Sequence, residues 1–250
     1  VRSEDETSAR ARLRREWWDW EDLRDAASAR VRAVSGDVSK PRLGLSDTTY
    51  AELTARLTHI IHAAADVRLF EPLESLRTVN ALGTRHALDL ARAAHADHGL
   101  ERFTHVSTAY VAGRCDGLVT EDELTDRHGF SSPYERSKYE AELLVRQAGE
   151  DLPVSIFRPS MIVGDSRTGA IRTFNTIYYP LRLYLTGRMS VVSAKRSLRV
   201  NLVPVDYVAD AITRLTFDPA ASGLTFCLTP PPEDTPSLGE VADFTRRWAA

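Results

Sequence analysis

The segment Ser131-Ser-Pro-Tyr-Glu-Arg-Ser-Lys138 opens a predicted helix over residues 133–149, and this helix lies between two predicted strands. The first strand is Phe103-Thr-His-Val-Ser107, and the second is Val154-Ser-Ile-Phe157, which Pro159 stops. Strands that alternate with helices in this way are typical of a parallel, doubly wound sheet. The segment therefore predicts an α/β fold class.

The alternation continues on both sides of this segment. Helices are predicted at 5–27, from Ser46 onward, and at 72–97, 174–184 and 206–215; strands are predicted at 31–35, 59–62 and 224–228. The pattern changes after Pro159, where Gly and Arg, and then aromatic residues, become frequent. We therefore expect a nucleotide-binding part at 1–164, a small substrate lobe at 165–203, a return to the sheet at 204–228 and a second part of the lobe at 229–250.

Tyr134 and Lys138 lie four residues apart on the predicted helix, so the phenol and the ammonium share one face. A cation held there favours the phenolate and lowers the pKa of a tyrosine from its usual value near 10. A hydroxyl of Ser107 or Thr108 could hold a substrate oxygen beside that phenol. Thr108, Tyr134 and Lys138 are therefore the predicted catalytic residues of a proton-donating site for carbonyl reduction.

Chance is a weak explanation for this spacing. The chain has 8 tyrosines and three lysines (40, 138 and 195), so about 0.1 matches are expected by random placement. The other 29 of its 32 basic residues are arginines. The presence of lysine in such an arginine-rich chain indicates a role that arginine cannot fill. A compact ammonium can both shift its pKa and bond a ribose hydroxyl, and a guanidinium cannot do both.

Seven stretches, in order along the chain, resemble the extended short-chain dehydrogenase/reductases and, within them, the branch of thioester reductases and fatty acyl-CoA reductases. They are Val34–Leu45, Ile60–Ala65, Val79–Thr84, His105–Gly113, Ser131–Lys138, Phe157–Asp165 and Val203–Ala209. The resemblance runs from about residue 1 to about 230. It implies a Rossmann-like domain, NADP (NADPH) as cofactor and a reductase activity.

The resemblance also implies where the cofactor binds. The resemblance assigns Asp37, with Val38, to contact with the edge of the adenine. Asp37 follows a predicted strand, at the position where open α/β sheets bind their ligands. The alternative is that Asp37 only forms a turn. Arg2 matches the arginine that NADP-using relatives place after their second strand, and Arg12 could add a contact, since guanidinium bonds a 2′-phosphate bidentately. In a chain with 29 arginines, either of them could lie there by chance.

Other candidate cofactor residues follow the later strands. Ala63, Ala64 and Ala65 are candidates for the floor beneath the second ribose, or are ordinary core residues. Asn80 lies mid-helix, where Asn is disfavoured; in relatives the matching Asn supports the catalytic Lys, and the alternative is an Asn that faces solvent. Pro159 and Met161 should border the nicotinamide, unless they only end a strand and fill the core. Ser107, Tyr134 and Lys138 should contact the cofactor as well.

The Gly-x-x-Gly-x-x-Gly loop of the resembled family is absent, since no two of the 13 glycines are three residues apart. That loop lets the backbone approach the pyrophosphate. Because Val1-Arg2-Ser3 resembles the end of the family's second strand, we expect the first strand, the loop and the first helix to precede residue 1. The chain is then a piece of a longer protein; a loop-less relative that binds no cofactor is the alternative.

The charge and composition of the chain limit the kinds of partner that it is expected to bind. A net charge of −3 gives no general attraction to nucleic acid or to an anionic membrane, and no apolar run is long enough to span a bilayer. The seven histidines have no Cys or carboxylate partners at metal spacing, so no metal site is predicted. Cys115 and Cys227 suit a reducing compartment, and the cytoplasm is the default expectation.

The leading hypothesis is the NADPH-dependent reduction of an acyl thioester, on coenzyme A or on an acyl or peptidyl carrier protein, to an aldehyde or further to an alcohol. An apolar and aromatic surface in the lobe, of which about half could be lobe core, favours an acyl chain: Phe174, Ile177, Tyr178, Tyr179, Leu181, Leu183 and Leu185. The alternative enzymes are a nucleotide-sugar epimerase or dehydratase and a hydroxysteroid-type dehydrogenase, although Ala109 stands where a dehydratase carries an acid. A non-catalytic Rossmann-like binding domain is the third hypothesis. The absence of a Gly-x-Ser-x-Gly elbow leaves hydrolase chemistry without support.

Overall fold

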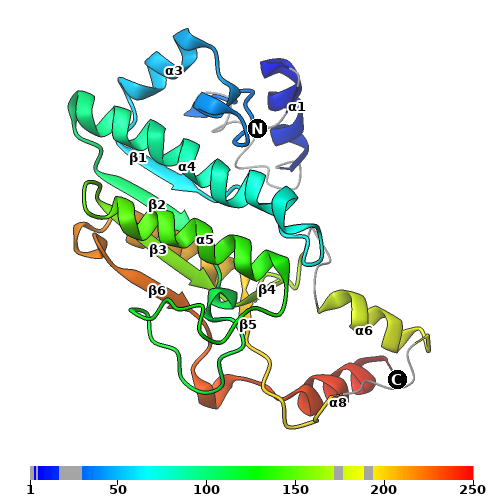
Figure 1. Ribbon diagram of the computed structural model, residues 1–250. Coiled ribbons are helices and arrows are strands. Elements are labelled where there is room, and N and C mark those ends of the chain that lie inside the picture. Colours follow the sequence, from blue (N-terminus) through cyan, green and yellow to red (C-terminus); the bar gives the residue numbers. More distant parts are fainter. Residues whose placement is uncertain (1–2, 4, 17–29, 172–176, 189–193, 250) are drawn as a thin grey trace. The chain divides into compact units, whose positions relative to one another are not determined.

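The computed structural model describes residues 3, 5–16, 30–171, 177–188 and 194–249 (Figure 1). Predictions on Arg2, on Phe174 and on the helix beyond Glu16 lie outside these residues. The chain divides into two compact units, each described by itself below. One consists of Val1–Phe103 and Ser132–Pro153, and the other of Thr104–Ser131 and Val154–Ala250. The domain boundaries expected at 164, 203 and 228 stay predictions.

The first unit contains most of the helical mass. Its elements are α1 (Glu6–Glu16), the 3-10 helix η1 (Pro41–Gly44), α3 (Asp47–Thr54), β1 (His59–His62), α4 (Leu73–His98), the start of β2 (Arg102–Val106) and α5 (Pro133–Ala148). Ser46 caps α3 by accepting a hydrogen bond from the Thr49 amide, as the sequence predicts.

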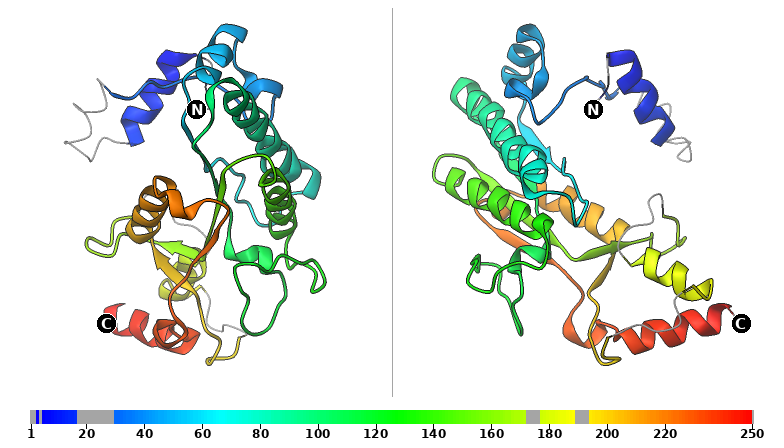
Figure 2. Two further views of the ribbon diagram at one scale, coloured as in Figure 1. Left: turned by 90° about the vertical axis from the view of Figure 1, so that its left-hand side faces the viewer. Right: turned by 45° about the vertical axis from the view of Figure 1, so that its right-hand side comes forward.

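Helices α4 and α5 lie side by side in the first unit (Figures 1 and 2). Each buries small and aliphatic side chains spaced three or four residues apart, including Leu88 and Ala91 on α4 and Val145 on α5. Arg77 of α4 also donates two hydrogen bonds, both of 2.7 Å, to the carboxylate of Glu140 on α5. Apolar packing and one ion pair thus fix the two helices together.

The second unit combines the remaining strands with shorter helices. Its elements are the rest of β2, η2 (Ala109–Ala112), β3 (Val154–Pro159), β4 (Met161–Val163), α6 (Tyr178–Leu185), β5 (Leu202–Pro204), α7 (Val205–Thr216), η3 (Pro219–Ala221), β6 (Thr225–Leu228), η4 (Pro232–Asp234) and α8 (Leu238–Ala249). Its core includes Phe157, Val203, Val208 and Leu228, and the rings of Phe157 and Phe226 stack 5.2 Å apart.

The strands form a four-stranded sheet, in the order β1-β2-β3-β6, and a two-stranded sheet of β4 and β5. Strand β3 pairs in parallel with β6, with Phe157 opposite Phe226, and β4 pairs in parallel with β5. Parallel pairs need a crossover connection, and the connection between β4 and β5 contains α6. The α/β fold with a parallel sheet predicted from the sequence is confirmed.

The strands of the structure differ from the sequence prediction in two places. Residues 31–35 form no regular element, because alternation alone makes no strand without a hydrogen-bonded neighbour, and no described strand pairs with them. Strands β4 and β5 were not predicted. Each has three residues, too few for a periodic signal, and they pair across about forty residues of chain.

The long connection after η2 is tied to the second unit's sheet by charged side chains. Buried Arg158 on β3 donates to the carbonyl oxygens of Thr120 and Glu123, and Glu121 accepts from the Cys227 amide on β6. At the start of this connection Gly113 has φ +64°, and a Cβ there would lie 2.2 Å from the Gly129 carbonyl oxygen. Only glycine permits this close approach.

Candidate active site

Helix α5 presents Tyr134 and Lys138 on one buried face. Ser132 caps the helix by accepting from the Glu135 amide at 3.3 Å, and Pro133 occupies the first helical position, where its missing N–H costs nothing. Tyr134 is 8% exposed and Lys138 2%. The local sequence therefore begins the helix one residue before the tyrosine and places the predicted proton donor and its cation one turn apart inside the first unit.

The pKa of Lys138 reflects two opposing influences. Burial lowers it from 10.5 to about 8, because a low-dielectric surrounding disfavours the ammonium, and the negative charge of Glu142 opposes this change. With a pKa near 8, Lys138 is still mainly charged at neutral pH. It is a cation close to the point of losing its proton, as expected for a functional rather than a structural lysine.

Asn80 joins the helix of Lys138 to the loop after β1. Its Oδ1 accepts from the Asp66 amide at 2.7 Å, and its Nδ2 donates to the Asp66 carbonyl at 3.0 Å and to Ser137 Oγ at 2.9 Å. The Ser137 hydroxyl in turn donates to the Tyr134 carbonyl at 2.8 Å. The side chain is buried, so a solvent-facing Asn is excluded. The arrangement suits a residue that positions α5.

His62, at the end of β1, is a buried group near Lys138 that the sequence did not single out. Its Nε2 lies 3.0 Å from Thr84 Oγ1, whose own proton goes to the Asn80 carbonyl at 2.6 Å. Thr84 must then accept, which assigns the proton of the neutral ring to Nε2. Burial, with the charge of Lys138 as a second cause, lowers the pKa of His62 from 6.5 to about 4. His62 is therefore uncharged at neutral pH.

A pocket of about 780 Å³ in the first unit is lined by several of the predicted cofactor residues. They are Arg12, Asp37, Val38, Ala64 and Ala65, together with aliphatic side chains from η1, α3 and α4. The alanines are not core residues, since Ala63 and Ala64 are exposed and Ala65 is half-buried. Asp37 Oδ1 accepts from the Ser39 amide and hydroxyl, which fixes its carboxylate at the pocket wall.

The pocket wall includes a strained turn. Arg42 and Leu43 have φ of 54° and 60°, and Gly44 follows at 64°. Positive φ is unfavourable for residues with a side chain. The turn is held by the Asp37 amide, which donates to the Leu43 carbonyl at 2.7 Å, and by the Arg42 guanidinium, which lies 4.4 Å over the Tyr50 ring. Strain of this kind is typical of functional loops.

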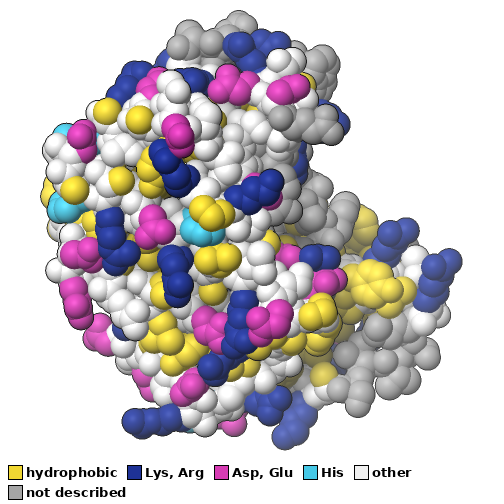
Figure 3. All heavy atoms as spheres, turned by 45° about the horizontal axis from the view of Figure 1, so that its top comes forward, with side chains coloured by type: hydrophobic (Ala, Val, Ile, Leu, Met, Phe, Trp, Pro, Cys, Tyr) yellow, Lys and Arg dark blue, Asp and Glu magenta, His cyan; other side chains and the backbone are white. Residues whose placement is uncertain are grey.

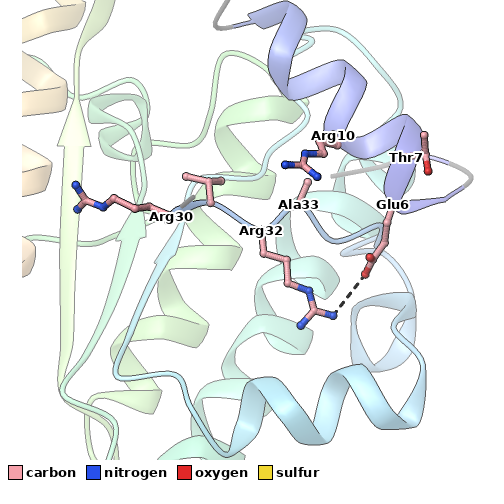
Figure 4. Close-up of a pocket in the computed structure, with 7 residues that line it drawn as sticks. Glu6, Thr7, Arg10, Arg30, Arg32 and Ala33 are labelled. Carbon is pink, nitrogen blue, oxygen red and sulfur yellow. Dashed lines mark ion pairs between the residues drawn. The ribbon is translucent and has the colours of Figure 1, made fainter. Parts of the chain in front are cut away.

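A second pocket of about 500 Å³ lies beside α1 in the same unit and is rich in arginine (Figure 4). Arg10, Arg30 and Arg32 line it with Glu6. Arg32 is occupied by carboxylates, since it binds Glu52 at 2.7 Å and lies 3.6 Å from Glu6. The predicted phosphate contact Arg12 lines the other pocket, and Arg2 lies outside the described residues.

The remaining predicted residues belong to the second unit. Ser107 and Thr108 are buried at the end of β2, where the Ser107 amide donates to the Phe157 carbonyl at 2.7 Å. Thr108 Oγ1 caps η2 by accepting from the Tyr110 amide and lies 3.5 Å from the Pro159 carbonyl oxygen. Pro159 ends β3 and half-buried Met161 begins β4. A donor-acceptor distance of 3.5 Å is long, so the Thr108 proton is only weakly held.

The structure thus gathers the predicted residues in two groups. Asp37, Val38, Ala64, Ala65 and Arg12 share a pocket; Tyr134 and Lys138 share a buried face of α5, next to Ser137, to which Asn80 of α4 donates. Sequence reasoning missed His62 and Glu142. The spacing of four residues from Lys138 could have indicated Glu142, since it repeats the spacing from Tyr134 to Lys138.

The described ranges lack the features of two other classes of site. These ranges contain no group of three or more His, Cys, Asp or Glu residues arranged to hold a metal ion. None of their helices is both long and apolar enough to cross a membrane. On the face shown in Figure 3, basic and acidic side chains lie interspersed rather than separated by sign.

A parallel α/β fold with tyrosine and lysine one turn apart on a buried helix face defines an oxidoreductase of the extended short-chain dehydrogenase/reductase type. The model of an NAD-binding family, described as male sterility protein, matches residues 1–212. The chain belongs to this family, whose cofactor is a nicotinamide dinucleotide.

One curated relative of the chain is a reductase. The chain is 32% identical over 240 residues to the large subunit of L-2-aminoadipate reductase of Penicillium chrysogenum, covering 90% of this chain but 16% of that protein. It therefore spans about a sixth of that relative's length.

Two solved structures extend this comparison. The terminal R domain from the myxalamid PKS-NRPS pathway is 32% identical with a TM-score of 0.88, over 99% of this chain and 62% of that one. The reductase domain of a nonribosomal peptide synthetase from Mycobacterium tuberculosis is 26% identical with a TM-score of 0.73, over 99% and 63%. The likeness covers nearly all of this chain.

Proposed function

We propose that this chain reduces an acyl thioester to an aldehyde with NADPH, the acyl group being carried on coenzyme A or on a carrier protein. One observation carries the proposal: Tyr134 and Lys138 are buried together on α5. The chain is also similar to an L-2-aminoadipate reductase and to the reductase domain of a nonribosomal peptide synthetase, which supports the proposal. Further reduction of the aldehyde to an alcohol would use the same groups.

The proposed chemistry assigns a role to each of the chain's polar groups. The bound nicotinamide supplies hydride to the acyl carbon. The Tyr134 hydroxyl, with Ser107 and Thr108, donates hydrogen bonds to the carbonyl oxygen as it gains negative charge. The carbon–sulfur bond then breaks, the carbonyl re-forms as an aldehyde, and a proton ends on the leaving thiol. Lys138 keeps the Tyr134 proton available and bonds a ribose hydroxyl.

The residues present fit the adenosine half of the cofactor. The pocket of about 780 Å³ is large enough for a nucleoside, and small residues form part of its wall. Asp37 offers a carboxylate for the adenine amino group, and Arg12 offers a guanidinium for the 2′-phosphate. In the proposal Arg12 and Arg2 select NADPH over NADH, and Pro159 and Met161 border the nicotinamide.

Recognition of the substrate is assigned to the segment after β4. Ile177 is buried, and the Tyr178 hydroxyl accepts from the Gly164 amide at 3.0 Å, so these two residues hold α6 in the second unit. Tyr179 and Leu185 are exposed on α6. This apolar surface suits an acyl chain better than the diphosphate of a nucleotide sugar. We expect turnover to rise with acyl chain length.

The test uses the full-length protein with NADPH and a series of acyl thioesters on coenzyme A and on a carrier protein. Tyr134→Phe removes the proton donor and keeps the ring, so aldehyde formation should fall by about 10²–10⁴-fold with NADPH binding largely intact. The matched control is Tyr207→Phe on α7, which removes an exposed hydroxyl and should leave turnover unchanged. Turnover by Tyr134→Phe within about threefold of wild type contradicts the role of Tyr134. Turnover of a nucleotide sugar, with every acyl thioester inert, contradicts the proposed function.

A further inference from the structure

Helix α5 carries a row of four polar side chains, each one turn after the last. Tyr134, Lys138, Glu142 and Arg146 are spaced by four residues, so they follow one face of the helix. Glu142 is 0% exposed, which makes it at least as buried as Lys138. Arg146 Nε lies 3.2 Å from Glu142 Oε1 and is the most exposed charge of the row.

A fully buried carboxylate requires a compensating charge, because leaving water costs an ion several kcal/mol. Arg146 supplies one such charge at the outer end of the row. At the inner end the carboxylate acts on Lys138, whose ammonium its negative charge favours. Along the helix Glu142 thus lies between a buried lysine and an arginine near the surface, and its negative charge interacts with both.

Other groups of the first unit near Lys138 or its helix are neutral or are paired elsewhere. Lys138 helps to lower the pKa of His62 on β1, and the His62 ring is neutral at physiological pH. Asn80 and Thr84, on the face of α4 that meets α5, are uncharged. Glu140 points to Arg77 and Arg136 and is not among the groups that act on Lys138. Glu142 is therefore the carboxylate whose negative charge favours the Lys138 ammonium against the effect of burial.

We propose that Glu142 is a positioning residue of this site: its buried carboxylate keeps Lys138 protonated beside Tyr134, and Arg146 holds that carboxylate in place. The link to catalysis rests on the function proposed above. The coupling between Glu142 and Lys138 does not, because it is a property of α5 and its surroundings alone.

The coupling is measurable without any substrate, because the chain has three lysines. With lysine labelled with ¹³C at Cε, the chain gives three titrating signals, and Lys40→Arg and Lys195→Arg identify the two exposed ones. In wild type the Lys138 signal should titrate near pH 8. Glu142→Gln keeps the shape and removes the charge, so the Lys138 midpoint should fall by about one pH unit or more.

Glu140→Gln is the matched control. It removes a carboxylate from the same helix, two residues away and also bound by arginine, yet it faces α4. The Lys138 midpoint should stay within about 0.3 pH units of wild type in this variant. An equal fall in both variants, or no fall in Glu142→Gln, overturns the proposal.

A second variant covers the case in which Glu142→Gln fails to fold. Arg146→Gln changes a partly exposed side chain and leaves Glu142 without its outer cation. The Lys138 midpoint should then rise, and a fall overturns the proposal. In the full-length protein the alkaline limb of kcat/KM should follow the same shifts. If no acyl thioester is turned over, the proposed function fails, while the NMR result still decides the role of Glu142.

Discussion

Two glutamates on α5 lie two residues apart and face opposite sides of the helix. The Glu140 side chain is 19% exposed and binds Arg77 of α4 and Arg136 of its own helix. Glu142 is fully buried and binds Arg146. Both are carboxylates paired with arginine, and only their surroundings differ.

This difference in burial gives two pairs of the same chemical kind different roles. Near solvent, water screens the Glu140 pairs, and such pairs contribute little to stability. Inside the protein, Glu142 and Lys138 are charges that folding must remove from water at a cost. The outer pair, Glu140 with Arg77, therefore serves to dock α4 on α5. The inner charges, Lys138 and Glu142, do not stabilise the fold, so we attribute them to the proposed proton-transfer chemistry.

The strongest test of this comparison is Lys138→Met, which should reduce activity and increase stability together. A folded pKa of about 8 against 10.5 unfolded means that burying the ammonium costs up to about 3 kcal/mol at pH 7. In wild type this penalty is present below pH 8 and disappears as the pH rises toward 10.5. Urea unfolding at pH 7 should show the variant to be more stable, while turnover and cofactor affinity fall at least about 10²-fold.

Lys195→Met is the control for this experiment, because it removes an exposed ammonium. Its stability should change by less than about 0.5 kcal/mol. A Lys138→Met protein that is less stable than wild type at pH 7 would show that the inner charges stabilise the fold, and the contrast with Glu140 would be lost.

His62 sharpens the comparison through pH. Its pKa is lowered in the folded state, so its contribution to stability is fully present above 6.5 and is lost as the pH falls toward 4. The loss amounts to about 3 kcal/mol at most. Unfolding free energies measured from pH 7 to pH 4 should fall less steeply in His62→Gln than in wild type. In Lys138→Met the pKa of His62 should rise, because a nearby cation is removed, so less of the His62 contribution to stability should be lost by pH 4. Identical pH profiles for all three proteins contradict this assignment.

Asn80→Ala tests the neutral polar contacts between the two helices. It leaves the Asp66 amide and carbonyl and the Ser137 hydroxyl without their partner, so stability should fall by about 2 kcal/mol. Thr78→Ala on the exposed side of α4 should cost less than about 0.5 kcal/mol. Chemical denaturation measures both. NADPH affinity should fall in Asn80→Ala alone, because Asn80 fixes the loop next to Ala64 and Ala65, and equal effects of the two variants would remove Asn80 from the site.

The smallest effect is expected for Glu140→Gln. The pKa of Glu140 is lowered by its hydrogen bonds to Arg77 and Arg136, so its contribution is present above the unfolded pKa near 4.5 and is lost in acid. At pH 7 the substitution should cost about 0.3–1 kcal/mol, and less at high salt. Denaturation at 0.05 and 1 M salt checks this, and a salt-independent loss of several kcal/mol would make the outer pair the stronger of the two.

The elements around the site were predictable because each carries a local signal. Ser132 and Pro133 begin α5, Ser46 begins α3, and apolar runs predict β1, β3 and β6. Residues 31–35 have the alternation of a strand but no described neighbour to pair with. Strands β4 and β5 are shorter than any periodic signal, and only their long-range pairing makes them strands.

The site was predictable to the extent that it depends on spacing along one helix. Tyr134 and Lys138 could be identified from their interval of four residues. The same interval leads to Glu142, but the sequence does not show that this glutamate is buried, because a glutamate in a helix rich in Glu and Arg resembles a solvated residue. Asn80 was expected to support Lys138, whereas its amide contacts Asp66 and Ser137. Such contacts depend on the packing of α4 on α5, which a single sequence does not contain.

The turn at Arg42, Leu43 and Gly44 has a consequence for the engineering of cofactor preference. Two residues held at positive φ store about 1 kcal/mol each. Gly36 cannot take a side chain without disturbing this turn, because a Cβ there would lie 2.9 Å from the Leu43 carbonyl oxygen. A designer who reshapes the pocket for an altered dinucleotide should therefore keep the 36–44 backbone unchanged and vary side chains that only line the wall, such as Leu53 and Val79.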